Sequence, residues 1–316
     1  MFIKSKPPNL QENIPLANHT TFRIGGPARY FFVAKSKEEF LEALNWAKEN
    51  NLPYFMLGGG SNLLVSESGF DGLVIKIKNG KLKIKNYNVK FKIILAEAGA
   101  PLALLVVQSL ENGLIGLEWA AGIPGTLGGA ICGNAGAYRH SISEAVESVE
   151  VFNAKDQEIQ SYSHKQCEFG YRESIFKKNQ NLIILTAKLK LGKGDTARAQ
   201  NFVQECLATR KNKIPSFPSA GSIFKNIEFG WQSENFKKLI PAEQIKGGMV
   251  AVGYLIEQCG LKGRQAGGAQ ISTQHANFIV NVISAKAADV LELINLCQES
   301  VKEKFGIELE KEIRIL

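Results

Sequence analysis

Two glycine-rich segments contain the residues of this sequence best suited to hold an anionic ligand. The first, at residues 58–62, directly follows the apolar run at residues 54–57, and the second extends from Gly122 to Ala137. Glycine allows the backbone to approach a ligand closely, and bare N–H groups can then converge on negative charge. A helix that starts nearby would add the positive end of its dipole. Two such loops favour a long phosphate-bearing ligand, such as a dinucleotide.

Neither segment matches a common nucleotide-binding fingerprint. The chain has no G-x-x-x-x-G-K-[ST], and no G-x-G-x-x-G between a strand and a helix with a downstream acidic residue. The sequence therefore argues against a Rossmann-type domain. Each loop taken alone is equally typical of a tight turn, whereas the two together favour ligand binding.

Composition limits the class of protein. The 316 residues, 45% of them hydrophobic, are enough for two or three packed units. The sequence contains neither an apolar run of about 18 residues nor a secretory leader, so we expect a cytoplasmic protein without a membrane span. Five scattered cysteines without a C-x-x-C pair and four dispersed histidines predict free thiols and no metal site. The net charge of +8 favours anionic ligands, but no dense basic stripe indicates a nucleic-acid partner.

The apolar pattern predicts alternating strands and helices. Ser36 and Glu39 form a capping box for a helix that ends at residues 50–51, and strands on either side complete a β-α-β unit. The predicted strands are residues 28–33, 54–57, 73–77, 91–97, 148–152, 182–191 and 277–283, and the further helices are residues 102–112, 196–213 and 284–305. This alternation predicts a mixed α+β protein. Prolines at residues 215 and 218 indicate a domain boundary.

Seven segments, in the same order, resemble the UDP-N-acetylenolpyruvoylglucosamine reductase (MurB) family of flavoenzymes. They are residues 21–27, 57–64, 122–138, 169–174, 220–226, 275–281 and 310–314, within a resemblance that extends from about Asn18 to the C-terminus. The first three segments also resemble the FAD-binding region of a wider group of flavoenzymes. No counterpart of the tyrosine loop of the longer family branch is present, so the chain resembles the shorter, type II form.

The resemblance implies an α+β fold with a two-subdomain FAD-binding region of the PCMH/VAO-like type and a C-terminal α+β substrate-binding subdomain. The implied FAD-binding subdomains are residues 1–72 and 73–214, with the C-terminal strand 307–316 returning to the second. The substrate-binding domain would be residues 215–306. The implied reaction reduces UDP-N-acetylglucosamine enolpyruvate to UDP-N-acetylmuramate for peptidoglycan, with non-covalent FAD and with NADPH as hydride donor. We expect the enzyme to be a monomer.

The same resemblance assigns FAD to the two glycine-rich segments. The expected cofactor-binding residues are Gly58, Gly59, Gly60, Ser61, Asn62, Gly122, Ile123, Pro124, Gly125, Thr126, Gly129, Asn134, Gly136 and Ala137.

Reduction of an enolpyruvyl group creates a carbanion beside a carboxylate, and this charge needs fixed positive or hydrogen-bonding groups. The resemblance assigns three catalytic residues: Arg172 holds the carboxylate, Glu312 acts with it, and Ser222 donates the proton. Without the motif context, each of them is more typical of a surface or turn residue. The expected substrate-binding residues are Tyr171, Arg172, Lys225, Asn226, His275 and Asn277. Arg210 and Lys213 are candidates for a phosphate contact, or equally for a solvated helix end.

Two positions depart from the family pattern. Ile227 follows Phe-Lys-Asn where proline is usual, and Cys132 occupies a position where bulkier residues are frequent, which brings a thiol near the expected flavin. Two other functions stay open. One is a different FAD-dependent small-molecule oxidoreductase of the same fold, which a covalent flavin would favour; the other is a non-catalytic flavin-binding module.

Overall fold

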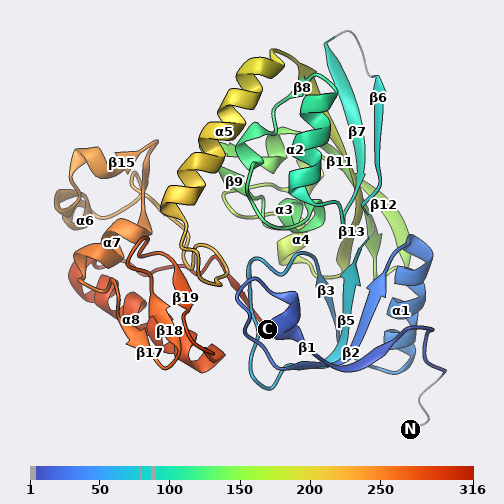
Figure 1. Cartoon of the computed structure of the whole chain (residues 1–316), viewed down its shortest axis with the longest axis horizontal. Coiled ribbons are helices and arrows are strands. Elements are labelled where there is room, and N and C mark those ends of the chain that lie inside the picture. The colour runs from blue at the N-terminus through green and yellow to red at the C-terminus, as the bar shows by residue number, and fades with distance from the viewer. Residues whose placement is uncertain (1–4, 79, 87–89) are drawn as a thin grey trace. The chain divides into compact units, whose positions relative to one another are not determined.

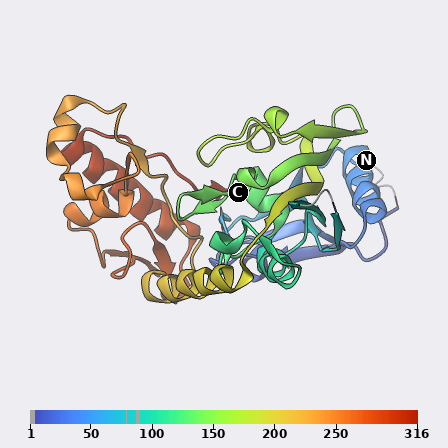
Figure 2. The same cartoon turned by 90° about the horizontal axis from the view of Figure 1, so that it is seen from above.

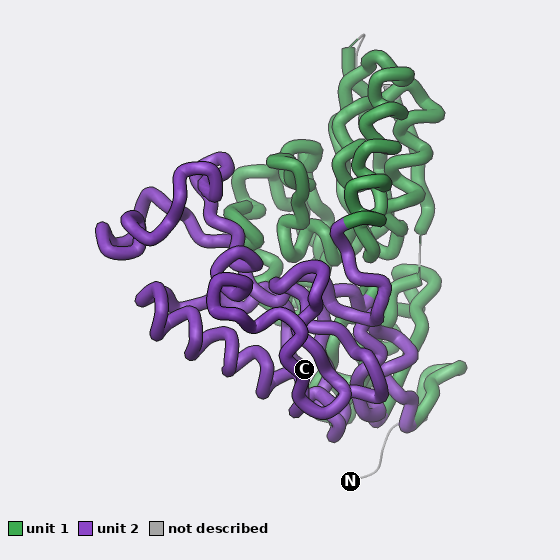
Figure 3. Tube along the Cα trace, turned by 60° about the vertical axis from the view of Figure 1, so that its left-hand side comes forward, with its two compact units in different colours: residues 1–12, 30–59, 71–212 green, residues 13–29, 60–70, 213–316 purple. Residues whose placement is uncertain are grey.

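The computed structural model describes residues 5–78, 80–86 and 90–316. These residues divide into two compact units (Figure 3). Unit 1 comprises residues 1–12, 30–59 and 71–212, and unit 2 comprises residues 13–29, 60–70 and 213–316. Strands and helices are mixed in both units, so the α+β prediction is confirmed. The chain leaves unit 1 within the first glycine-rich segment, after Gly59.

Unit 1 is built mainly on an antiparallel sheet with the strand order β12-β11-β13-β7-β6, and β8 also pairs with β13 (Figure 1). Its strands are β6 (Leu82–Asn86), β7 (Phe91–Glu97), β8 (Leu114–Ile115), β11 (Val146–Asn153), β12 (Glu158–Ser163) and β13 (Leu182–Lys193). The helices of this part are α2 (Leu102–Glu111), α3 (Leu127–Cys132), α4 (Ile175–Lys178) and α5 (Thr196–Lys213). A short hairpin, β9 (Gly136–Ala137) and β10 (His140–Ser141), follows α3.

A second sheet has the strand order β1-β2-β5-β3. Its elements are β1 (Gln11–Pro15), β2 (Pro27–Ala34), β3 (Tyr54–Leu57), β5 (Phe70–Ile77) and the helix α1 (Lys37–Glu49) between β2 and β3. Ser36 caps α1 as predicted, since its hydroxyl accepts a hydrogen bond from Glu39 N at 3.2 Å. The predicted β-α-β unit is present, but β5 lies between β2 and β3 and pairs in parallel with β3.

Strand β13 shows how burial shapes the sequence pattern in unit 1. From Thr186 onward its buried side chains alternate with exposed ones, because one face of the strand packs on the sheet's core and the other meets water. Its first four residues are all buried, since Leu182 and Ile184 belong to the core with α2, α3 and α4, whereas Ile183 and Leu185 belong to the core with α1. The helices that cover the sheet can be followed in Figure 2.

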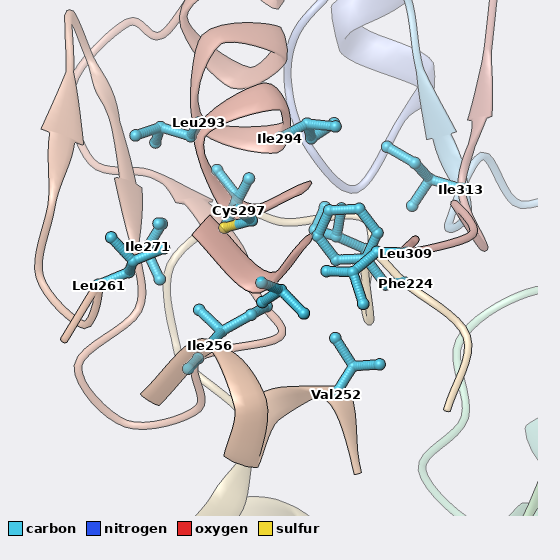
Figure 4. Close-up of a cluster of buried hydrophobic side chains, with 14 of the residues drawn as sticks. Phe224, Val252, Ile256, Leu261, Ile271, Leu293, Ile294, Cys297, Leu309 and Ile313 are labelled. Atoms are coloured by element: carbon cyan, nitrogen blue, oxygen red, sulfur yellow. The ribbon is translucent and has the colours of Figure 1, made fainter. Parts of the chain in front are cut away.

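Unit 2 contains several short strands and the long helix α8. Its strands are β4 (Leu63–Leu64), β14 (Ile227–Glu228), β15 (Ile245–Lys246), β16 (Met249–Val250), β17 (Gln265–Ala266), β18 (Ala269–Ile271), β19 (Ile279–Asn281) and β20 (Arg314–Ile315), and its helices are α6 (Glu234–Leu239), α7 (Val252–Gln258) and α8 (Ala287–Phe305). Figure 4 shows the core, in which Leu293 and Cys297 of α8 lie with Ile256 of α7 and Phe224. Burial raises the pKa of the Cys297 thiol to about 12, so this cysteine is inert at neutral pH.

The C-terminal strand β20 pairs in parallel with β4, with Arg314 opposite Leu63. This partner lies within residues 1–72, whereas the sequence prediction returned the strand to residues 73–214. The pairing matters for function because it fixes the chain just after Glu312 beside the first glycine-rich segment.

The boundaries of the predicted strands and helices agree with the structure within three residues. One of the largest differences is the start of α8, which begins at Ala287 and not at Ser284. Ser284 has a positive φ of 47°, which a helix cannot accommodate, and the Asp289 carboxylate instead accepts a hydrogen bond from Lys286 N. Gly306 ends α8 as predicted, with a φ of 68°.

No helix among the described residues is long and apolar enough to cross a membrane. Within the same residues, His, Cys, Asp and Glu side chains form no group of three or more that could hold a metal ion.

Candidate functional site

The two glycine-rich segments meet within unit 1. A Cβ atom on Gly59 would lie 2.7 Å from Gly125 Cα, and one on Gly58 would lie 2.7 Å from Thr126 Oγ1. Side-chain carbons do not approach backbone atoms this closely, so the first segment can reach the second only because it lacks side chains. The structure therefore brings the two glycine-rich segments into direct contact.

The second segment turns through two glycines with positive φ, Gly122 at 74° and Gly125 at 122°. It then enters α3, a helix that starts close to the loop as expected. The first three N–H groups of this helix already have partners. They donate to Ala100 O, Ala98 O and Thr126 Oγ1, all inside the protein. An anion at this site would therefore meet the loop backbone and not these helical N–H groups.

Arg210 of α5 lies against the second segment, where its Cδ is 2.9 Å from the position of a Cβ on Gly122. Its Nε atom is buried and has no hydrogen-bond partner among the described residues. Burial also lowers the pKa of this guanidinium. A buried donor left without a partner costs free energy unless a ligand completes it. The touching glycine backbones and this orphaned donor both fit a phosphate-bearing flavin.

The end of the second segment holds the Arg172 side chain. Arg172 Nη2 donates to Gly136 O at 2.7 Å, and Nη1 donates to Asn134 O at 3.4 Å. The buried Asn134 amide donates in turn to Gly170 O at 2.7 Å and accepts from Ser143 N at 3.3 Å. Asn134, predicted as a cofactor residue, thus uses its side chain to hold the turn that carries Arg172.

Arg172 occupies a strained backbone position. Gly170 and Glu173 form a tight turn through two mutual backbone hydrogen bonds, and Arg172 within it has a φ of 56°. Lys177 Nζ stabilises the turn by donating to Arg172 O at 3.0 Å and to the Glu173 carboxylate at 2.9 Å. Half-exposed Tyr171 places its ring 5.4 Å from Arg172 Cζ. A non-glycine residue at positive φ that its surroundings enforce is typical of functional sites.

Ser222 and Glu312 come together within unit 2. Residues 222–224 lie between two other segments, with Ser222 bridged to Phe278 and Phe224 bridged to Lys311. Glu312 N donates to Ile223 O at 2.8 Å, which puts the glutamate next to the segment that carries Ser222. The Ser222 hydroxyl makes no hydrogen bond to any described residue, so it is open to a ligand.

Asparagine side chains position these two residues, and the sequence did not indicate this role. The Asn277 amide is 3% exposed and pairs with both backbone groups of Phe224, donating to the carbonyl at 2.8 Å and accepting from the N–H at 3.0 Å. Asn62 donates from its side-chain amide to Glu312 O at 3.0 Å, and its backbone carbonyl accepts from Arg314 N at 3.0 Å. Asn226 accepts a hydrogen bond from Val252 N at the start of α7. The spacing of residues in one sequence cannot reveal hydrogen-bond partners that are so far apart along the chain.

Lys225 and His275, both predicted substrate residues, are also built into unit 2. Lys225 is 7% exposed, and its Nζ lies 2.6 Å from the exposed carboxylate of Glu310. His275 Nδ1 accepts a hydrogen bond from Asn277 N at 3.2 Å. Burial lowers the pKa of His275, and the charges of Lys262 and Lys213 add to the effect, so its ring is neutral at pH 7.

The structure thus forms two partial sites, each within one unit. In unit 1, the glycine backbones, Asn134 and Gly136 lie with Arg172; in unit 2, Ser222 and Glu312 lie with Asn62. The common meeting of Arg172, Ser222 and Glu312 stays a prediction.

Comparison with known proteins gives these sites a family context. Residues 28–161 match the model of an FAD binding domain, and residues 212–316 match the model of the UDP-N-acetylenolpyruvoylglucosamine reductase C-terminal domain. A protein of that name from Solibacter usitatus is 38% identical over 97% of this chain and 97% of its own length. Another reductase of this name, from Caldanaerobacter subterraneus, is 40% identical over 96% of this chain and 92% of its own length. The chain belongs to the UDP-N-acetylenolpyruvoylglucosamine reductase family.

A solved structure from the same family supports the fold. The crystal structure of the UDP-N-acetylenolpyruvylglucosamine reductase (MurB) of Thermus caldophilus is similar with a TM-score of 0.74, at 34% identity over 97% of this chain and 99% of that chain. The chain is therefore an FAD-dependent oxidoreductase. The residues matched by the FAD binding domain include both glycine-rich segments, and those matched by the C-terminal domain of this reductase family include Ser222 and Glu312.

The structure shows the surroundings of Ile227 and Cys132, the two positions that depart from the reductase family pattern. Ile227 is a buried residue of β14 and pairs with Val250 of β16, so the position serves a strand here. Cys132 ends α3, and its carbonyl accepts a hydrogen bond from the Ser174 hydroxyl at 2.7 Å. Its proximity to a flavin stays a prediction.

Proposed function

We propose that this enzyme reduces UDP-N-acetylglucosamine enolpyruvate to UDP-N-acetylmuramate with FAD and NADPH, and that Arg172, Ser222 and Glu312 carry the chemistry. The main observation behind this assignment of residues is the hydrogen bond from Glu312 N to Ile223 O, which joins the glutamate to the segment that contains Ser222. Family membership supports the reaction, and the strained, well-held Arg172 turn supports the third residue.

The expected cofactor residues suit an FAD diphosphate and ribityl chain. Gly58, Gly59 and Gly125 would admit the cofactor close to the backbone, and Arg210 would satisfy its buried Nε on an oxygen of the ligand. When bound, the flavin supplies the two electrons of the reduction. The protein's own residues must then hold the substrate, stabilise the charge that develops on it, and deliver a proton.

Arg172 holds the substrate carboxylate in this proposal. A guanidinium presents five N–H donors in a planar fork, so it can keep its contacts with backbone carbonyls while it binds a carboxylate. When electron density builds at the carbon next to the carboxylate, it delocalises onto the carboxylate oxygens as an enolate. The fixed positive charge then binds the transition state more tightly than the ground state. Glu312 acts on the same carboxylate from the segment that lies beside Ser222.

Ser222 donates the proton to the enolate carbon. A hydroxyl is a weak acid in water, so it can serve only when its oxygen is held in position against a strongly basic carbon. The Asn277 amide provides this positioning, because it fixes both backbone groups of Phe224 two residues after the serine. Asn62 does the same for Glu312 through its carbonyl.

A spectroscopic and kinetic assay tests the proposal. The purified protein should show a flavin absorption band, which NADPH bleaches and the enolpyruvyl nucleotide sugar restores. NADPH consumption should depend on the sugar. A protein that binds flavin but reduces only oxygen would support the alternative of a different FAD-dependent oxidoreductase, and a flavin that NADPH does not bleach would support a non-catalytic flavin-binding module.

The division into residues 1–72, 73–214 and 215–306 also remains our proposal. The match of residues 212–316 to a separate C-terminal domain supports the boundary near residue 215. The nucleotide-sugar substrate follows from the family. A monomeric state, a cytoplasmic location and the lack of a nucleic-acid partner stay predictions from the sequence.

A further inference from the structure

The hairpin between β9 and β10 has an unusual turn. Gly136 pairs with Ser141 and Ala137 pairs with His140, which leaves Tyr138 and Arg139 as the two turn residues. Their φ angles are 53° and 68°, the pattern of a type I′ turn. Asparagine and glycine are the usual residues of such turns, since bulky side chains are strained at positive φ. This hairpin therefore carries strain that a glycine at residue 139 would relieve.

The residues on either side of Arg139 are anchored to the rest of unit 1. The Tyr138 hydroxyl donates to Cys206 O at 3.2 Å, and its ring packs edge-on against Phe202 of α5. His140 Nδ1 lies 2.8 Å from the Glu144 carboxylate. At its base, the hairpin accepts the Arg172 hydrogen bond through Gly136 O. The turn is therefore held in a fixed relation to the proposed catalytic arginine.

Unlike Tyr138 and His140, Arg139 does not anchor the turn through its side chain. Its side chain is exposed and makes no hydrogen bond, ion pair or ring contact with a described residue. Nothing in the described structure offsets the strain of its backbone through its own side chain. Because a strand rises about 3.3 Å per residue, the tip of the turn lies within roughly 7 Å of Gly136, a distance that an arginine side chain can span. An unpaired guanidinium at the tip of an anchored turn, whose base accepts a hydrogen bond from Arg172, suits an anionic ligand.

We propose that Arg139 binds a phosphate group of a ligand that enters the active site at each turnover. This inference rests on the proposed function, which supplies two such ligands, the nucleotide sugar and NADPH. The exposure of Arg139 suits an exchanging ligand and not a resident cofactor. In this proposal the backbone strain at Arg139 persists because the side chain contributes to the affinity for the ligand.

Three variants separate charge from strain. Arg139→Gln removes the charge and keeps the strain, and Arg139→Gly removes both. Gln157→Gly is the matched control, because Gln157 is an exposed residue of another hairpin turn in unit 1 with a φ of 59°. Both glycine variants should raise the Tm by about 2–4 °C, the shift expected for relief of one strained residue. Only the two Arg139 variants should raise a KM, about tenfold, as expected for a lost charge-assisted contact.

KM is measured separately for the nucleotide sugar in turnover and for NADPH in flavin reduction, at low and high salt. A rise for one ligand identifies the source of the phosphate, and a rise for both means that the two ligands share the site. The rise should shrink at high salt because an exposed charge is screened. Unchanged KM values for both ligands, or loss of flavin without a KM change, would overturn the proposal. A wild-type enzyme that does not turn over the sugar would instead refute the proposed function.

Discussion

Replacement of Gly59 by alanine tests whether the touching glycine loops form the FAD site. Gly59 has ordinary backbone angles, so alanine meets no conformational barrier there. Its Cβ, however, would lie 2.7 Å from Gly125 Cα, where carbon atoms normally stay about 3.5–4.0 Å apart. The two backbones must therefore separate by about 1 Å. Because both partners are main chain, no side-chain rotation can relieve the contact.

Two magnitudes follow. Overpacking of this kind lowers the free energy of unfolding by about 1–3 kcal/mol. The loop donors also move away from the ligand, and loss of one hydrogen bond to a charged group costs about 1.5–3 kcal/mol, or at least tenfold in FAD affinity. At an FAD concentration that is 100 times the wild-type Kd, the stabilisation by FAD should fall from about 2.7 kcal/mol to about 1.4 kcal/mol or less.

The assay is flavin content after purification, followed by FAD titration and thermal unfolding with and without FAD. Gly230→Ala is the matched control, since its Cβ would meet no atom within 4 Å and its φ is ordinary. Gly58→Ala should be milder than Gly59→Ala, because the obstructing atom is the Thr126 hydroxyl, which can rotate. If Gly59→Ala bound FAD as tightly as the wild type and Gly230→Ala, the loops would not form the site.

Three other predictions concern the proposed catalytic and positioning residues. Ser222→Ala should leave flavin reduction by NADPH intact but slow reoxidation by the enolpyruvyl sugar by orders of magnitude in stopped-flow absorbance; equal slowing of both half-reactions would exclude a proton donor. Asn277→Ala should lower the free energy of urea unfolding by about 2–5 kcal/mol, because it leaves two buried backbone groups of Phe224 without partners, and a loss below about 1 kcal/mol would contradict this. Since burial lowers the pKa of His275, the neutral ring contributes stability above the unfolded-state value near 6.5 and loses it as the pH falls. The Tm of the wild type should therefore drop more between pH 7 and pH 5 than that of His275→Asn, and parallel pH curves would show that His275 is not the cause.

Local features of the fold could be predicted because their causes lie within a few residues. The cap of α1 at Ser36, the end of α8 at Gly306 and the limits of β3 and α5 all depend on neighbouring side chains or on periodicity. The prediction for α8 was wrong at its start because the cap depends on Asp289, whose carboxylate also accepts from Gly268 N, far away in sequence.

The candidate site was predicted in two different ways. The glycine-rich loops followed from the physical properties of glycine, whereas Arg172, Ser222 and Glu312 depended on the family resemblance. The roles of Asn134, Asn277 and Asn62 in holding these residues were not predicted. An asparagine side chain can cap a turn, bind a ligand or pair with a distant backbone. The residue type alone therefore does not show which of these roles an asparagine has.

By itself, the sequence determined which segments lack side chains, where the chain becomes helical or extended, and which side chains carry chemistry. These properties depend on local backbone preference and on the period of burial. Only the tertiary structure decided that Gly59 lies on Gly125 and that Asn62 holds the carbonyl of Glu312, 250 residues away. Such contacts form only when distant segments pack together. Their geometry depends on the final positions of two backbones, so neither segment shows them as a periodic pattern in its own sequence.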